Sequence, residues 1–190
     1  MVATRDRFVR IAAATLVAVA GSGRAPVRAA VVRAGPYCSP SKAASLGDDY
    51  DFRLPTLDGG DVHFGALSGS PLWLNFFASW CAPCNREAAV VERLARRHAA
   101  AGLVVVGIDV GETPEVARAF RDRHALTFPI GLDLGGAVFR ALGFDAYPTH
   151  AFFDEAGRMT CCVAGGLDEN EMANEIAVAF AAPPQARPRR

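Results

Sequence analysis

Between residues 52 and 180, apolar segments typical of strands alternate with segments typical of helices. This alternation predicts a layered α/β domain. Continuous apolar runs over Pro71–Phe77 and Leu103–Val110 indicate strands that are buried on both faces of a sheet. Each run precedes a predicted helix. Apolar residues at helical spacing predict the first, over Cys81–Ala100. The start signals Thr113-Pro114-Glu115, a capping residue, a first-position Pro and an acid in the first turn, predict the second, which extends to His124. This strand–helix–strand–helix order favours a parallel pair of strands joined by a right-handed crossover.

Shorter segments complete the expected domain. Phe52–Leu54 and Val62–Phe64 alternate around the turn residues Leu57–Gly60, which predicts a β-hairpin. A short helical stretch, two strands joined by a turn and a final helix are expected, in that order, at Gly136–Leu142, Thr149–Phe153, Arg158–Val163 and Asp168–Phe180.

The length of 190 residues suffices for one domain with a full core, together with a leader and a tail. We expect the domain at residues 46–182, after a linker at 21–45 and before a disordered tail at 183–190. The net charge is zero, but residues 46–180 contain 10 basic and 19 acidic residues. Because the expected domain is acidic, nucleic acid is not an expected partner.

Residues 1–20 have the pattern of an export signal. Arginines precede the apolar run Ile11–Ala20, which ends in a small-x-small pattern suited to signal peptidase. The run is too short for an ordinary transmembrane helix, although an uncleaved short membrane anchor is an alternative. Further arginines soon after the run oppose translocation, and an Arg-rich leader also suits an organelle transit peptide. We therefore expect a periplasmic or other extracytoplasmic protein, which could be attached to the membrane through its N-terminus. The lumen of an organelle is the alternative location.

Two cysteines lie where the first buried strand meets the first helix. Cys81 is expected in the first helical turn, where unpaired backbone N–H groups and the helix dipole favour a thiolate. Pro83 suits this turn because its missing N–H would have no intrahelical partner. The C-x-x-C spacing places Cys84 within bonding range, so it can resolve a mixed disulfide formed by Cys81. The pattern predicts Cys81 as the nucleophile of a redox-active disulfide with Cys84.

Glu87 shares a helical stripe with Cys84, Val90, Val91 and Leu94. Burial beside a dithiol disfavours the charged form of a carboxyl group, and such a group could relay the proton of Cys84 during exchange. We therefore predict Glu87 as a third catalytic residue. The alternative is a glutamate at the boundary of the core whose carboxyl group reaches water.

The segment Asn75–Cys84, together with Glu87, resembles the TlpA/ResA/CcmG branch of membrane-associated, extracytoplasmic thioredoxin-like thiol-disulfide oxidoreductases. Ordinary thioredoxins have a buried Asp where this sequence has Asn75, whereas this branch typically carries its acid at the place of Glu87. The resemblance implies an α/β thioredoxin-like fold, with a mixed central sheet flanked by helices, an N-terminal β-hairpin and a central insertion. Phe128–Ile130 and Gly136–Leu142 look like that insertion.

Tyr147-Pro148-Thr149 resembles the cis-proline segment that lies against the dithiol in this superfamily. A cis X-Pro bond is uncommon, and here it would leave the backbone of Tyr147 free to pair with a substrate strand. Trp80 precedes the nucleophile and is expected to shield it and to present substrate. The resemblance therefore implies that Trp80, Tyr147 and Pro148 dock the substrate.

The same resemblance implies a reductant of specific protein disulfides, of the kind used in cytochrome c maturation or copper-site assembly. Its expected partners are substrate protein disulfides and a membrane thiol-disulfide electron donor, and the sequence contains no cofactor motif. An oxidant of the same fold is an alternative, because C-x-x-C alone does not fix the direction of electron flow. A non-redox assembly or holdase factor that uses the same groove is a second alternative.

Three other cysteines and one histidine remain. Cys161 and Cys162 are adjacent on a predicted strand and so point to opposite faces, which favours buried structural thiols. A disulfide from either of them to Cys38, a vicinal disulfide, and a zinc site shared with the C-x-x-C pair are alternatives. His150 could approach the dithiol, but we expect it to be packed on its strand.

Overall fold

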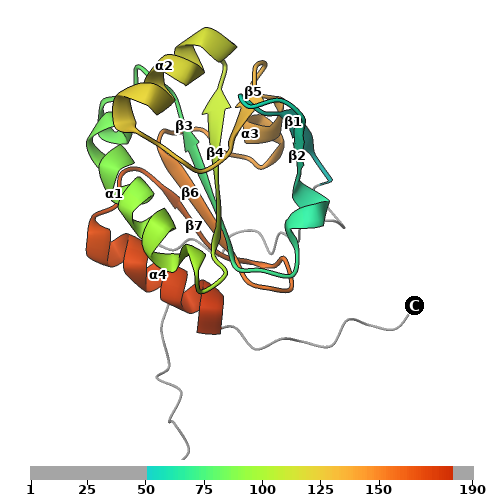
Figure 1. Cartoon of the computed structure of the whole chain (residues 1–190). Coiled ribbons are helices and arrows are strands. Elements are labelled where there is room, and N and C mark those ends of the chain that lie inside the picture. The colour runs from blue at the N-terminus through green and yellow to red at the C-terminus, as the bar shows by residue number, and fades with distance from the viewer. Residues whose placement is uncertain (1–50, 182–190) are drawn as a thin grey trace, which may run out of the picture.

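The computed structural model describes residues 51–181, so the expected leader, linker and tail lie outside the described residues. A five-stranded mixed sheet forms its centre (Figure 1). β3 (Leu72–Phe77) is the middle strand and runs parallel to β4 (Val104–Val110), which in turn runs parallel to β5 (Ile130–Asp133). On its other side β3 pairs antiparallel with β6 (Thr149–Phe153), which pairs antiparallel with β7 (Met159–Ala164). The apolar runs predicted as buried strands are thus the two innermost parallel strands.

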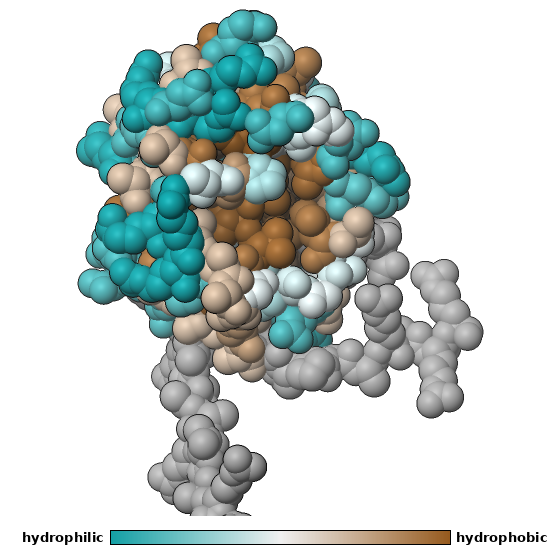
Figure 2. Space-filling model, in the orientation of Figure 1, coloured by the Kyte–Doolittle hydropathy of each residue, from teal (hydrophilic) through white to brown (hydrophobic). Residues whose placement is uncertain are grey.

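Helices cover both faces of the sheet (Figure 1). The cluster on one face takes residues from α1 (Ala82–Ala99), α2 (Pro114–His124) and α4 (Glu169–Ala181), and the cluster on the other face takes residues from α3 (Ala137–Ala141). β3 contributes alternate side chains to the two clusters, as the pleat of a strand requires. Figure 2 shows apolar side chains at the centre of one face of the molecule, with more hydrophilic side chains around them.

The predicted hairpin is present and packs against the edge of the sheet. It consists of β1 (Arg53–Pro55) and β2 (Asp61–His63), and a short 3-10 helix, η1 (Phe64–Leu67), follows it. Leu57 N donates a hydrogen bond to the carbonyl oxygen of Ile130, which attaches the hairpin turn to β5. A Cβ atom at Gly131 would lie 3.1 Å from a methyl carbon of the hairpin, so the close approach favours glycine there.

The predicted elements are found with boundaries shifted by at most one residue. Two short elements were not separated by the sequence pattern, namely η1 and the edge strand β5. Both have only four residues, which is too few to display a period. Among the described helices, none has the length and apolar character that crossing a membrane requires.

The central strand provides a test of the fold. Leu74→Ala removes a fully buried side chain from β3 and is expected to lower the free energy of unfolding by about 2–5 kcal/mol. Leu134→Ala makes the same chemical change at a side chain that is 54% exposed, and is expected to cost roughly 0.5 kcal/mol or less. Urea unfolding followed by circular dichroism measures both values. Equal losses in the two variants would contradict the central position of β3.

Candidate active site

Cys81 and Cys84 form a disulfide at the N-terminus of α1, with their Cα atoms 5.3 Å apart. Cys81 is the N-cap residue of this helix, and its Sγ accepts a hydrogen bond from the backbone N of Cys84 at 3.2 Å. Pro83 lies in the first turn, as its chemistry predicts. After reduction, the same N–H group and the helix dipole favour a thiolate at Cys81.

Hydrogen bonds from two other elements fix the turn that carries Cys81. Glu112, just after β4, accepts bonds from the backbone N and the Oγ of Ser79, at 2.5 and 2.7 Å. Asn85 Nδ2 donates to the carbonyl oxygens of Ser79 and Cys81, both at 2.8 Å. The Oδ1 atom of Asn85 lies 3.0 Å from the Nε2 of His124 on α2. The turn between β3 and α1 is therefore tied to β4 and α2.

Glu87 lies one helical turn after Cys84 and is only 6% exposed, so its side chain is mostly shielded from water. Its Oε1 accepts a long hydrogen bond, 3.5 Å, from Asn75 Nδ2 and lies 3.2 Å from His150 Nε2. Its Oε2 accepts a bond from the backbone N of Leu167 at 3.3 Å. The acid predicted from the helical stripe therefore lies inside the core, and polar groups from three other segments surround it.

Trp80 and Tyr147 bring two distant loops together beside the dithiol. Trp80 is 69% exposed, and its ring meets that of Tyr147 edge to face with centroids 5.4 Å apart. Tyr147 also stacks on Phe139 at 4.6 Å. The Tyr147-Pro148 peptide bond is cis, as the resemblance implies. An exposed aromatic ring thus lies next to Cys81, in contact with the loop that carries the cis-proline.

Asp109, which sequence analysis missed, is a further acid close to this region. It belongs to the carboxyl end of β4 and is 1% exposed, and neither carboxyl oxygen has a hydrogen-bond partner among the described residues. Burial, followed by the charge of nearby Glu112, raises the pKa of Asp109 to about 8. Burial, followed by the charges of Asp133, Asp109 and Glu112, also raises the pKa of Tyr147. The available signal was an acid that interrupts an otherwise apolar run.

The two cysteines of β7 differ from each other. Cys161 is buried and takes part in a disulfide, whereas Cys162 is a free, partly buried thiol. The expectation of two structural thiols is therefore wrong for Cys161, and a vicinal disulfide is excluded because Cys162 is free. Burial raises the pKa of Cys162 to about 11. Cys38 lies outside the described residues, and within residues 51–181 no cluster of His, Cys, Asp and Glu could bind a metal ion.

Comparisons with known proteins agree with this geometry. A family model described as the AhpC/TSA family matches residues 47–161. The thiol-disulfide oxidoreductase ResA of Halalkalibacterium halodurans is 31% identical over 119 residues, covering 63% of this chain and 68% of the relative. The thioredoxin-like protein YneN of Bacillus subtilis is 34% identical over 128 residues, covering 66% and 75%. The solved structure of MTB DsbF matches with a TM-score of 0.66 and 28% identity, covering 72% of this chain and all of that one.

The buried Asp109 makes the stability of the protein depend on pH. Between about pH 4 and pH 8 the folded protein keeps a proton on Asp109 that the unfolded chain loses, so stability falls as pH rises. Asp109→Asn removes this proton uptake, and its stability relative to the wild type is expected to rise by roughly 2–3 kcal/mol between pH 5 and pH 7. Urea unfolding at both pH values measures the difference.

Asp145→Asn serves as the control, because Asp145 is exposed. This variant is expected to follow the pH dependence of the wild type. If Asp109→Asn also followed the wild-type curve, the carboxyl group of Asp109 would be ionised in the folded protein and its assignment as a buried acid would fail.

Proposed function

Because the chain belongs to the AhpC/TSA family and to the TlpA/ResA/CcmG-like thioredoxin-fold thiol-disulfide oxidoreductases, we propose that it reduces disulfides of specific extracytoplasmic proteins. The observation that carries this proposal is the Cys81–Cys84 pair at a helix N-terminus, one turn before a buried carboxyl group. The first sulfur has the surroundings of a nucleophile, and the second has a potential proton acceptor at Glu87.

The reaction proceeds in two exchanges. The Cys81 thiolate attacks one sulfur of a substrate disulfide, which forms a mixed disulfide and releases the other substrate sulfur as a thiolate. Cys84 then transfers its proton to Glu87 and attacks Cys81 Sγ. The Cys81–Cys84 disulfide forms, the second substrate sulfur leaves and is protonated, and two electrons have passed to the substrate. An external dithiol must reduce the protein again, and a membrane thiol-disulfide electron donor fits this role.

The loops beside the dithiol supply a docking surface in this proposal. Trp80 presents an exposed ring, and Tyr147 packs against it from the loop of Pro148. An extended substrate segment could pair with the backbone of Tyr147 while its disulfide meets Cys81. The expected substrates are apocytochrome c or copper-site proteins. This assignment rests on the resemblance of the segment Asn75–Cys84 and on relatives that are named ResA.

An extracytoplasmic location is part of the proposal. The pattern of residues 1–20 supports it, because basic residues precede a short apolar run that ends in a small-x-small motif. A thiol reductant there would act against an oxidising environment, so it would need a dedicated source of electrons.

The direction of electron flow is tested by the equilibrium reduction potential of the Cys81/Cys84 pair. Equilibration of the purified protein in dithiothreitol redox buffers, followed by trapping of thiols, is expected to give about −250 mV or lower. A dedicated reductant requires such a value, because its disulfide must be the more stable product. A value of about −130 mV would overturn the proposed direction and indicate an oxidant of exported proteins.

The roles of the two cysteines are tested by single serine substitutions. Cys84→Ser is expected to accumulate a mixed disulfide with a substrate protein, because nothing resolves it, whereas Cys81→Ser forms none. Non-reducing electrophoresis with reduced protein and insulin as the probe distinguishes these outcomes. The double variant with serine at both positions is expected to lose all reductase activity. Survival of its cellular activity would instead support the holdase or assembly factor.

A further inference from the structure

His150 lies beside the catalytic acid although it is far from it in the sequence. It is fully buried on β6, two residues after Pro148, and pairs with Asn75 of β3 across the sheet. Its Nε2 lies 3.2 Å from Oε1 of Glu87. The fold therefore places an imidazole, a carboxyl group and the resolving Cys84 in one region of the core.

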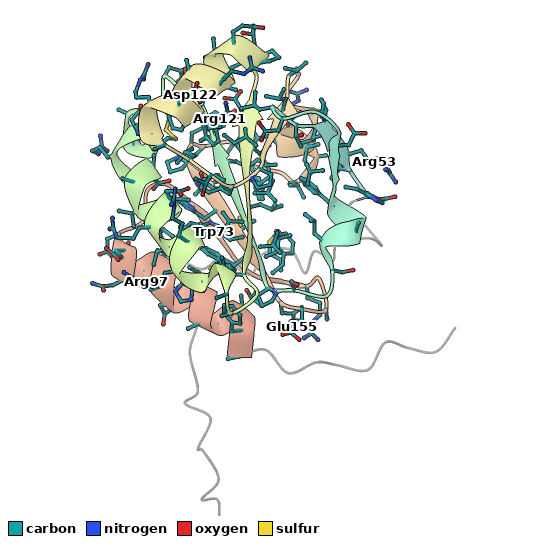
Figure 3. The ribbon with its side chains drawn as sticks, in the orientation of Figure 1. Arg53, Trp73, Arg97, Arg121, Asp122 and Glu155 are labelled. Atoms are coloured by element: carbon teal, nitrogen blue, oxygen red, sulfur yellow. A yellow bond between two sulfur atoms is a disulfide. The ribbon has the colours of Figure 1, made fainter. Side chains whose placement is uncertain are left out.

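The hydrogen bonds at Nδ1 define the tautomer of this imidazole. The Nε1 of Trp73 and the Nδ2 of Asn75 both lie 3.2 Å from Nδ1 of His150. Indole N–H and amide NH₂ groups can only donate, so Nδ1 must accept. Trp73 lies in the interior beside α1 (Figure 3). A neutral imidazole whose Nδ1 accepts carries its hydrogen on Nε2, and an imidazolium would set an N–H at Nδ1 against two donors.

Among the described residues, Oε1 of Glu87 is the polar atom that lies near the hydrogen on Nε2 of His150. The 3.2 Å separation is within ion-pair distance, but among the described residues Nε2 has no partner in hydrogen-bond geometry. A small rotation of the carboxyl group would align the bond. A buried N–H without a partner is costly, so this contact favours a position of Glu87 in which the bond is made.

The other polar neighbours of Glu87 are also donors. Asn75 Nδ2 approaches Oε1 and the backbone N of Leu167 approaches Oε2. An ionised carboxylate can only accept hydrogen bonds, so these donors match the form of Glu87 that the proton transfer requires. Cys84, one turn earlier on α1, and His150 on β6 are the titratable groups that face Glu87, since its remaining described partners are neutral.

We propose that His150 is a positioning residue for the resolving step: its fixed Nε2–H orients and stabilises the Glu87 carboxylate that accepts the Cys84 proton. This inference rests on the proposed dithiol function. In the step, the S–H bond of Cys84 breaks and its proton moves to Glu87. The S–S bond between Cys84 and Cys81 forms while the bond from Cys81 to the substrate breaks, and the substrate sulfur takes the electron pair.

The reaction of the reduced protein with 5,5′-dithiobis(2-nitrobenzoate) separates the two chemical steps. Attack by Cys81 releases a first thionitrobenzoate, and resolution by Cys84 releases the second. His150→Phe keeps a ring in the core and removes the Nε2–H. We expect it to slow the second release about tenfold at pH 7 and to move its pH profile to higher pH. The first release is expected to remain within about twofold of the wild-type rate.

His150→Gln is the matched control, because its amide can still donate toward Glu87. It is expected to restore the second release to within about threefold of wild type. Equal slowing of both releases, no slowing in His150→Phe, or a His150→Gln protein as slow as His150→Phe would overturn the inference. A wild-type protein that releases only one thionitrobenzoate would instead overturn the dithiol function, and this inference with it.

A measurement on the wild-type protein covers the case in which His150→Phe does not fold. Long-range ¹H–¹⁵N spectra distinguish the two neutral tautomers of histidine, and the spectrum of His150→Gln assigns the signals of His150. We expect the Nε2–H tautomer of His150 in both the oxidised and the reduced protein. An Nδ1–H tautomer, or an imidazolium at pH 7, would overturn the proposal.

Discussion

β3 is buried on both faces, and the arrangement of the other strands and of the site around it follows from this burial. As the middle strand it is apolar at every position except Asn75, whose side chain is buried as well. Its carboxyl end delivers Cys81 to the N-terminus of α1, and the end of parallel β4 brings Glu112 to the same edge. Antiparallel β6 begins there with the cis-proline segment. Three strands thus assemble the site at one edge of the sheet.

Several polar side chains of the site are buried in the core. Asn75, Glu87 and His150 are buried, and their contacts with one another reduce the cost of removing them from water. Asp109 lacks such partners among the described residues, and burial disfavours its charged form, which raises its pKa. The surroundings of Glu87 and Asp109 therefore differ. Hydrogen-bond donors surround Glu87, whereas Asp109 has no hydrogen-bond partner among the described residues and its pKa is raised to about 8.

The turn that carries Cys81 is held by hydrogen bonds, whereas the neighbouring side chain of Trp80 is exposed. Ser79 hydrogen-bonds to Glu112, and Asn85 hydrogen-bonds to the turn and to His124. These bonds fix the sulfur of Cys81 relative to the sheet. The side chain of Trp80, the residue before Cys81, is exposed to solvent. A fixed sulfur next to an exposed ring would suit the proposed exchange with a partner protein, because the orientation of the sulfur is set before the partner binds.

Local sequence patterns predict the type and order of the main elements, the place of Cys81 at a helix N-terminus, and the inward direction of Glu87. Each follows from local periodicity or capping, which act over a few residues. Contacts between distant segments account for the rest. His150 lies beside Glu87, and Glu112 accepts a hydrogen bond from Ser79. Cys161 takes part in a disulfide, whereas Cys162 is a free thiol. The physical reason is that a period shows which face of an element is buried, but not which distant side chain covers it.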